Sequence, residues 1–130
     1  MTLGSPAIDP GIEAAITATV LDYYEGWFEA DATRMGRALH PRLVKRSVHR
    51  TPGEVAEATY DDMVAATAQG EGTRHGPDQR RFTISINHVH NTIADVHVTG
   101  DVYVDYLQLA QVDGRWQILN ALWAPKADGS

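Results

Sequence analysis

Residues 104–123 read VDYLQLAQVDGRWQILNALW. Two apolar runs flank Asp113–Gly114, and an Asp-Gly pair between strand-forming runs is a strong signal for a tight β-hairpin turn. The stretch therefore predicts a hairpin over 102–123 with mostly buried strands. Asp105 breaks the pattern, because it places a carboxylate near the start of the first strand, among residues that should pack.

More strand-like runs surround this hairpin in the sequence. Residues 80–91 and 93–99 precede it and predict, together with it, an antiparallel meander. A weakly alternating run at 42–50 predicts one further short strand. Residues 70–79 read GEGTRHGPDQ, a composition typical of a loop.

The first half of the chain predicts three helices. Asp9-Pro10 is a good helix start, because aspartate accepts free N–H groups and proline suits the first helical position. Apolar residues then recur at spacings of three and four through 11–29. Asp31 caps a short second helix, and a capping-box pattern opens a third at 59–69. The fold class is therefore α+β, with three N-terminal helices packed on one face of a strongly curved antiparallel sheet.

Length and composition predict one globular domain over residues 1–130. The chain is 43% hydrophobic and 22% charged, which is ordinary for a globular protein long enough to bury a core. Its net charge of −6 disfavours binding to nucleic acid and to anionic membranes, because both require a basic face. The lack of cysteine excludes disulfides and thiolate chemistry and fits a cytoplasmic location.

Targeting and membrane segments are not apparent in the sequence. The N-terminal residues MTLGSPAIDPG lack the basic and apolar regions of a signal peptide. No apolar run approaches the roughly 20 residues needed to span a bilayer. We therefore expect a soluble cytoplasmic protein.

Two stretches carry a resemblance to a known superfamily: YYEGWFEADATRMGRALHP at 23–41 and DYLQLAQVDGRWQILNALW at 105–123. With the predicted order of elements, they resemble the nuclear transport factor two-like superfamily, which includes ketosteroid isomerase, scytalone dehydratase and the SnoaL-like cyclases. The second stretch most resembles the branch named "putative lumazine-binding". The resemblance covers about 10–124 and implies a cone with an internal pocket, and a homodimer formed through the convex sheet face.

The resemblance to ketosteroid isomerase implies specific site residues. That family holds an oxyanion with a tyrosine of the first helix and a protonated aspartic acid of a late strand, and a separate aspartate moves the proton. Carried onto this sequence, the tyrosine falls on Tyr23, or on Tyr24 if the helix is rotated by one position. The strand acid falls on Asp105. The proton-moving aspartate falls on Ser47, which cannot accept a proton at neutral pH without a partner, so steroid isomerisation by that mechanism is disfavoured.

Asp105 has two interpretations. In an apolar pocket, burial would raise its pKa and let the neutral acid donate a hydrogen bond. Alternatively, it is ionised and pairs with an arginine of a neighbouring strand or faces solvent. Alternation groups Asp105 with Tyr103 and Leu107, against Val104 and Tyr106. Both groups are largely apolar, so the pattern leaves open which of them faces the pocket.

Two histidines offer a replacement for the missing base. Period-two alternation places His88 and His90 on one strand face with Phe82, Ile84 and Ile86. A neutral imidazole there could act as a general base near pH 7, and the resemblance to scytalone dehydratase implies a similar use of histidine. The alternative is that both rings lie hydrogen-bonded or solvated at the open end of the sheet. Without a third ligand at a recognisable spacing, the pair does not predict a metal site.

Further side chains complete the candidate ligand-binding set. These are Tyr24, Trp27, His40, His49 and Trp123. His49 is the titratable residue nearest to Ser47. Dinucleotide, P-loop and serine-hydrolase motifs are missing from the sequence, so we expect no cofactor.

The sequence therefore predicts a protein with a pocket for a small hydrophobic or aromatic ligand. It is either a non-catalytic binder or a cofactor-independent isomerase, dehydratase or cyclase. In the second case Tyr23 and Asp105 would hold an oxyanion, and His88 or His90 would move a proton. A protein-interaction or dimerisation module that uses the convex sheet face is the alternative.

Overall fold

A computed structural model describes residues 8–126. The N-terminal residues 1–7, for which no signal peptide is predicted, and residues 127–130 lie outside the described residues. Within 8–126 the chain forms α-helices α1 (Pro10–Glu29), α2 (Ala32–Ala38) and α3 (Tyr60–Ala68), 3-10 helices η1 (Glu71–Arg74) and η2 (Pro77–Gln79), and strands β1 (Leu39–Ser47), β2 (Ala56–Thr59), β3 (Phe82–His90), β4 (Ile93–Gly100), β5 (Tyr103–Val112) and β6 (Arg115–Pro125).

The three helices begin where their capping residues predict. The Asp9 side chain accepts two N–H groups in the first turn of α1, at 2.8 and 3.1 Å. Asp31 accepts the N–H of Arg34 at 3.1 Å and starts α2. Thr59 and Asp62 form both hydrogen bonds of a capping box at α3. Each such cap stabilises its helix by about 1 kcal/mol.

The six described strands form one sheet in the order β2-β1-β6-β5-β4-β3. The predicted meander is confirmed as β3 to β6, in which each strand pairs antiparallel with the next. The expectation of a wholly antiparallel sheet is wrong at one place, because β1 and β6 pair in parallel. The chain leaves β1, forms α3 and the meander, and returns beside β1 in the same direction. The short edge strand β2 had no sequence signal.

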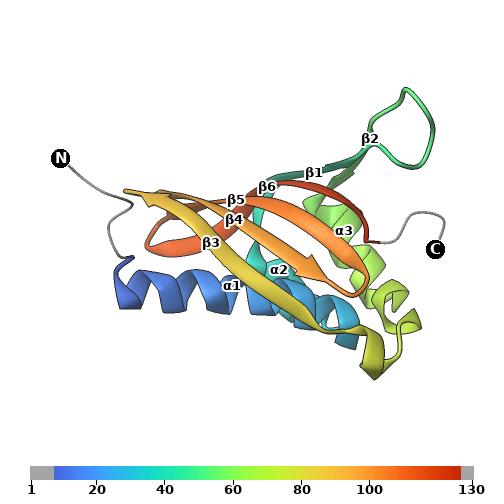
Figure 1. Cartoon of the computed structure of the whole chain (residues 1–130), viewed down its shortest axis with the longest axis horizontal. Helices are drawn as coiled ribbons and strands as arrows, with labels where there is room; N and C mark the ends of the chain where they lie inside the picture. Colours follow the sequence, from blue (N-terminus) through green and yellow to red (C-terminus); the bar gives the residue numbers. More distant parts are fainter. Residues whose placement is uncertain (1–7, 127–130) are drawn as a thin grey trace.

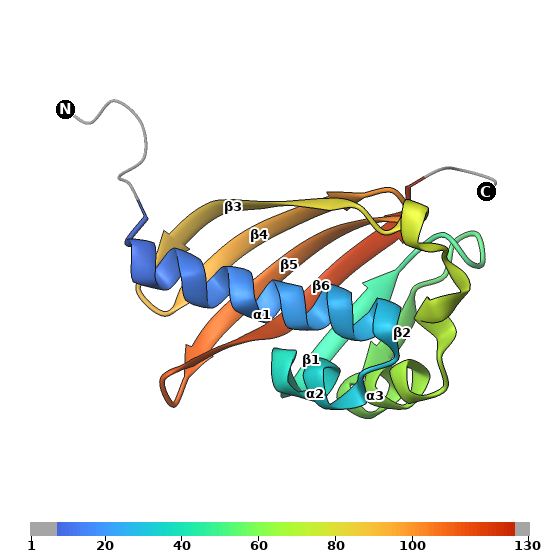
Figure 2. The same ribbon diagram turned by 90° about the horizontal axis from the view of Figure 1, so that it is seen from below.

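The helices lie on one side of the curved sheet. Figure 1 shows the sheet above α1 and α2, with α3 at the end of the molecule where β2 lies. Figure 2 shows α1 crossing the strands, while α2 and α3 gather near β1 and β2. Register shifts interrupt the β3–β4 and β5–β6 ladders, and such bulges bend and twist a strand. The predicted α+β class, with helices on one face of a bent sheet, is confirmed.

The core lies between α1 and the inner face of the sheet. Ile16 and Val20 of α1 are fully buried, as are Leu107 of β5 and Ile118 of β6. Burying each of these side chains stabilises the fold by about 1.5–3 kcal/mol relative to leaving it exposed. Among residues 8–126, no helix is both long and apolar enough to cross a membrane.

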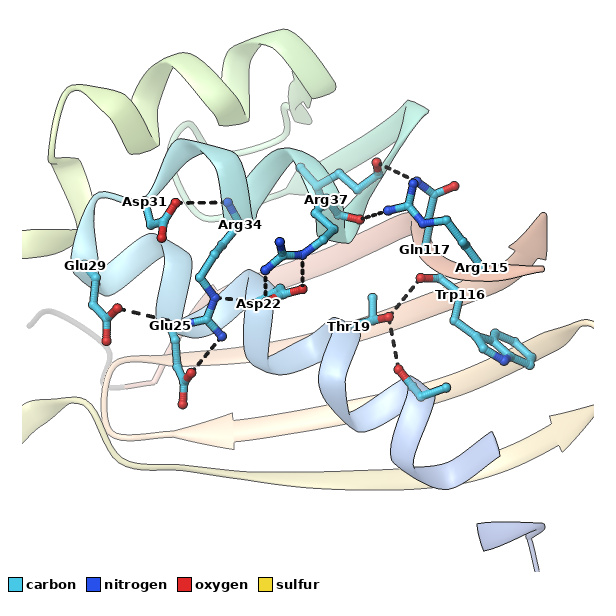
Figure 3. Close-up of polar contacts among 12 residues, drawn as sticks. Thr19, Asp22, Glu25, Glu29, Asp31, Arg34, Arg37, Arg115, Trp116 and Gln117 are labelled. Carbon is cyan, nitrogen blue, oxygen red and sulfur yellow. Dashed lines mark hydrogen bonds and ion pairs between the residues drawn. The ribbon is translucent and has the colours of Figure 1, made fainter. Parts of the chain in front are cut away.

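Polar contacts fix the position of α1 (Figure 3). The Thr19 hydroxyl donates to the carbonyl oxygen of Trp116 on β6 at 2.8 Å. Asp22 accepts from Arg34 at 2.9 Å and from Arg37 at 2.8 Å, which joins α1 to α2. These contacts set the orientation of the helix turn that follows, and that turn carries the tyrosines of the site.

Candidate functional site

A cavity of about 550 Å³ lies between α1, the inner face of the sheet and α3. Its volume lies in the range typical of small-molecule sites. The wall combines aromatic rings with charged side chains and is lined by Tyr23, Tyr24, Trp27, Lys45, Ser47, Arg50, Ala56, Glu57, Ala58, Asp62, Met63, Ala66, Glu71, Arg74, His75, Tyr103, Asp105 and Trp123.

Asp105 belongs to this wall. The register pairs it with Trp123 on β6, and its side chain is only 2% exposed on the same sheet face as Leu107. Oδ2 accepts a hydrogen bond from the Tyr24 hydroxyl at 2.5 Å. Oδ1 is buried and has no hydrogen-bond partner among the described residues. Asp105 forms no ion pair with an arginine within residues 8–126, and it is buried from solvent, so both versions of the second interpretation are wrong.

Burial sets the protonation behaviour of Asp105. Loss of hydration raises the pKa of its carboxyl above the ordinary value, although the nearby charge of Lys45 and the bond from Tyr24 act in the opposite direction. Burial and the neighbouring Asp105 likewise raise the pKa of the Tyr24 phenol. Tyr24 therefore stays a proton donor, and Asp105 retains a proton to higher pH than an exposed aspartate does.

Neighbouring tyrosines of α1 have different partners. Tyr23 and Tyr24 are both buried, and their rings meet edge to face with centroids 5.4 Å apart. Tyr24 contacts Asp105, whereas the hydroxyl of Tyr23 accepts a hydrogen bond from Nζ of Lys45 at 2.5 Å. The tyrosine that binds Asp105 is therefore Tyr24, the alternative to Tyr23 that is expected if the helix is rotated by one position.

Lys45 is a wall residue that the sequence reasoning missed. Its Nζ lies 5.1 Å from the ring centroid of Tyr23 and 5.0 Å from that of Trp123. Burial lowers the pKa of the amine, and the charge of Asp105 opposes this effect. Period-two alternation within the predicted strand at 42–50 places Lys45 on the face of Ser47, and that signal could have found it. Ser47 is itself buried in the wall.

A second group of aromatic rings forms the neighbouring part of the wall. Trp27 donates from Nε1 to the Tyr103 hydroxyl at 2.9 Å, and that hydroxyl lies 3.2 Å from Nε2 of His75. Burial lowers the pKa of His75, and the charges of Arg74 and Arg80 add to the effect. A neutral imidazole can accept a hydrogen bond from the Tyr103 hydroxyl. Trp27, Tyr103 and His75 then form a continuous chain of hydrogen bonds. Tyr103 could have been found from its place two residues before Asp105.

His88 and His90 do not share a face with Ile86. The register of β3 shifts between Ile86 and His88, so Val89 turns inward in their place and both histidines are exposed. They line a separate depression of about 270 Å³, whose other residues include Ile93 and Asn120. The structure therefore does not bring them together with Asp105. The bulge, which alternation could not reveal, causes the difference.

The remaining candidates are divided between the cavity and its surroundings. Trp27 and Trp123 line the cavity. The ring of His49 lies edge-on to Trp123 with centroids 4.7 Å apart, outside the lining itself. His40 lies on β1 outside the cavity lining, and its Nδ1 accepts the N–H of Arg42 at 3.0 Å. Among residues 8–126, no three acidic or histidine side chains gather as a metal site would require.

Solved structures show which fold this is. An NTF-2 like protein of unknown function from Silicibacter pomeroyi DSS-3 is 19% identical, with a TM-score of 0.71 over 92% of this chain and 99% of that chain. A ketosteroid isomerase-like protein from Erwinia carotovora atroseptica SCRI1043 is 15% identical, with a TM-score of 0.57 over 88% and 95%. A "putative scytalone dehydratase" from Novosphingobium aromaticivorans DSM 12444 is 15% identical, with a TM-score of 0.58 over 90% and 85%.

At these identities the likeness establishes the fold and not the activity. The predicted nuclear transport factor two-like fold is confirmed. A search of curated proteins found no match. The family described as "Putative lumazine-binding" matches residues 12–124. Since this match covers most of the sequence, the chain belongs to that family.

Proposed function

We propose that this protein binds a small aromatic compound in the cavity and holds an oxygen-bearing group of that compound against Asp105. The observation that carries the proposal is the Asp105 carboxyl, which is buried in the cavity wall with one oxygen bound to Tyr24 and the other without a partner. Buried polar groups in proteins are nearly always hydrogen-bonded, because an unmet one costs about 1–3 kcal/mol. A ligand group would supply the missing partner.

The surrounding wall favours a flat, unsaturated ligand. Tyr24, Trp27, Tyr103 and Trp123 present ring faces and edges, which contact aromatic compounds well. The cavity is also open enough to admit a ligand, unlike the plugged interior expected of a pure interaction module. Both features support binding within the cone.

Thermal denaturation with a matched pair of compounds tests this proposal. Naphthalene and 2-naphthol share their rings and differ by one hydroxyl group. At about one hundred times its dissociation constant, 2-naphthol should add about 2.7 kcal/mol of stability, or several degrees in Tm. The variant Tyr24→Phe with Asp105→Leu removes both ends of the buried pair and should lose the preference for 2-naphthol over naphthalene. Failure of both compounds to stabilise the wild-type protein would contradict the proposal.

Proton transfer on the bound ligand is a second candidate function. Asp105 and Lys45 lie in one wall, and burial shifts the pKa of each toward its neutral form, as is common in acid–base sites. A ketone whose oxygen accepts a hydrogen bond from Asp105 would lose a neighbouring C–H proton more readily, and the neutral amine of Lys45 would take up that proton. Exchange of the methyl hydrogens of 2-acetylnaphthalene in D₂O, measured by NMR, tests this activity. Exchange no faster than in buffer would exclude it for this compound.

A homodimer through the outer sheet face is part of the proposal. Tyr106 of β5 and Leu122 of β6 are 49% and 48% exposed there, and the register places them directly opposite each other. The resemblance to the superfamily implies that a second copy of the chain covers this face. The cytoplasmic location stays a prediction that rests on the lack of cysteine.

A further inference from the structure

Lys45 holds its amine at the cavity wall without a carboxylate partner. Within the described residues it takes part in no salt bridge. Its Nζ has the Tyr23 hydroxyl as hydrogen-bond partner at 2.5 Å, and the rings of Tyr23 and Trp123 flank it. This environment differs from that of a surface lysine, whose ammonium is fully hydrated.

The surroundings favour a reactive amine. Burial lowers the pKa of Lys45, and the positive charge of Arg50 adds to this effect, while the Asp105 carboxyl opposes it. Burial also raises the pKa of Tyr23, so its phenol keeps its proton next to the amine. The two side chains thus pair a nucleophile with a proton donor, which is what addition to a carbonyl group requires.

We propose that Lys45 forms a Schiff base with the carbonyl group of an aromatic aldehyde or ketone bound in the cavity. The inference rests on the proposed function, since the carbonyl compound would occupy the same cavity. It adds a covalent step and assigns it to a residue other than Asp105. A carbonyl carbon near Nζ would also lie close to the Tyr23 hydroxyl.

The step is balanced without a further reactant. The lone pair of neutral Nζ forms a bond to the carbonyl carbon as the C=O π bond breaks, and one of the two nitrogen protons passes to the carbonyl oxygen through the Tyr23 hydroxyl, which gives a carbinolamine. The nitrogen then loses its remaining proton, the C–O bond breaks, and one water leaves as the C=N bond forms. The Tyr23 hydroxyl can donate a proton to the departing oxygen and recover one from the nitrogen.

The lysine content of the chain makes this proposal easy to test. The sequence holds two lysines, Lys45 and Lys126, and Lys126 is exposed. The full chain is incubated with 2-naphthaldehyde and sodium cyanoborohydride, which near neutral pH reduces an imine to a stable secondary amine far faster than it reduces the free aldehyde. Peptide mapping by mass spectrometry then locates the added mass. We expect on the order of tenfold more adduct on Lys45 than on Lys126, because only Lys45 is desolvated beside a proton donor.

Three variants keep the result interpretable. Lys45→Met and Lys45→Arg should abolish the adduct at position 45 and leave the labelling of Lys126 unchanged. Circular dichroism confirms that each variant is folded. Tyr23→Phe should slow trapping at Lys45, because it removes the proton donor but not the amine.

The alcohol 2-naphthylmethanol separates this inference from the proposed function. It has the same rings and no carbonyl group, so it tests binding alone by its effect on Tm. If it stabilises the wild-type protein while the aldehyde labels Lys45 no more than Lys126, the Schiff base is overturned and the proposed function stands. If it gives no stabilisation and Lys45 stays unlabelled, both fail.

Discussion

The Tyr24 hydroxyl donates a hydrogen bond to Oδ2 of Asp105 at 2.5 Å, which leaves Oδ1 of the same carboxyl buried without a partner. The protein therefore provides a hydrogen-bond partner for one of the two Asp105 carboxyl oxygens and places the carboxyl in the wall of a cavity. The bond also contributes to the charge balance of the site, because it lowers the pKa of Asp105 against the effect of burial.

Removing this bond should affect Asp105 specifically. Tyr24→Phe is expected to cost about 1–3 kcal/mol in the free energy of unfolding, since it leaves a second buried carboxyl oxygen unpaired. It should also raise the pKa of Asp105 further, because the bond that favours the carboxylate is lost. Chemical denaturation measures the first effect, and a ¹³C NMR titration of the carboxyl carbon measures the second.

Tyr23→Phe is the matched control for this variant. It removes the neighbouring hydroxyl, whose partner is Lys45 and not Asp105. The hydrogen bond from Tyr24 to Asp105 should persist in this variant. The pKa of Asp105 should therefore change less in Tyr23→Phe than in Tyr24→Phe. Equal shifts in the two variants would show that the Tyr24 bond does not control the carboxyl.

The free energy of unfolding should depend on pH through the titration of Asp105. Its folded pKa is raised above the ordinary value of 3.8, so its contribution to stability is present below that pH and is lost as pH rises through the folded pKa. Asp105→Asn resembles the neutral acid and has no such titration. The free energy of unfolding of Asp105→Asn relative to wild type should therefore rise as pH increases from about 4. A difference that stays constant with pH in urea denaturation would refute this account of the carboxyl.

The ion pairs between α1 and α2 should behave in the opposite way (Figure 3). Hydrogen bonds from Arg37 and Arg34 lower the pKa of Asp22, so its stabilisation is present above the ordinary value of 3.8 and is lost as pH falls through the folded pKa. Asp22→Asn should cost about 1 kcal/mol at neutral pH, because these pairs are only partly buried. The penalty should shrink in acid, and urea midpoints at neutral and acidic pH measure both values. A penalty that is unchanged in acid would mean that the carboxylate charge is not its source.

If the outer sheet face forms the dimer, a charge introduced on that face should disrupt the dimer, and a charge introduced elsewhere should not. Leu122→Arg puts a cation on the outer sheet face opposite Tyr106 and should convert a dimer into monomers. Val55→Arg is the control, because Val55 is 58% exposed in the segment before the edge strand β2 and not on the central strands β5 and β6. Sedimentation velocity at several protein concentrations distinguishes the two states. A wild-type protein that is monomeric throughout would refute the dimer.

Local sequence signals predicted the helices and the meander well. The caps at Asp9, Asp31 and Thr59 act over three or four residues, so they can be read without knowing the fold. The Asp113–Gly114 turn is local in the same way, and both residues adopt positive φ values, 53° and 79°. Features that depend on long-range pairing were less accessible, including the parallel β1–β6 ladder and the edge strand β2.

The site was only partly predictable for the same reason. Asp105 was recognised as unusual, but both alternating sets of its strand are apolar, and only the assembled sheet determines which set faces inward. Tyr23 and Tyr24 are adjacent on α1 and both are buried, so periodicity could not choose between them. A single bulge turned His88 and His90 outward. Lys45 was overlooked although it shares a strand face with Ser47.

The most direct test of the central claim is the ¹³C NMR signal of the Asp105 carboxyl carbon during a titration with 2-naphthol. The signal is identified by its loss in Asp105→Asn. If the ligand supplies the missing partner of Oδ1, this resonance should move with the same saturation curve as the thermal stabilisation, while the exposed Asp113 carboxyl stays unchanged. If 2-naphthol stabilises the protein and the Asp105 resonance does not move, the ligand binds without this carboxyl and the proposed role of Asp105 is wrong.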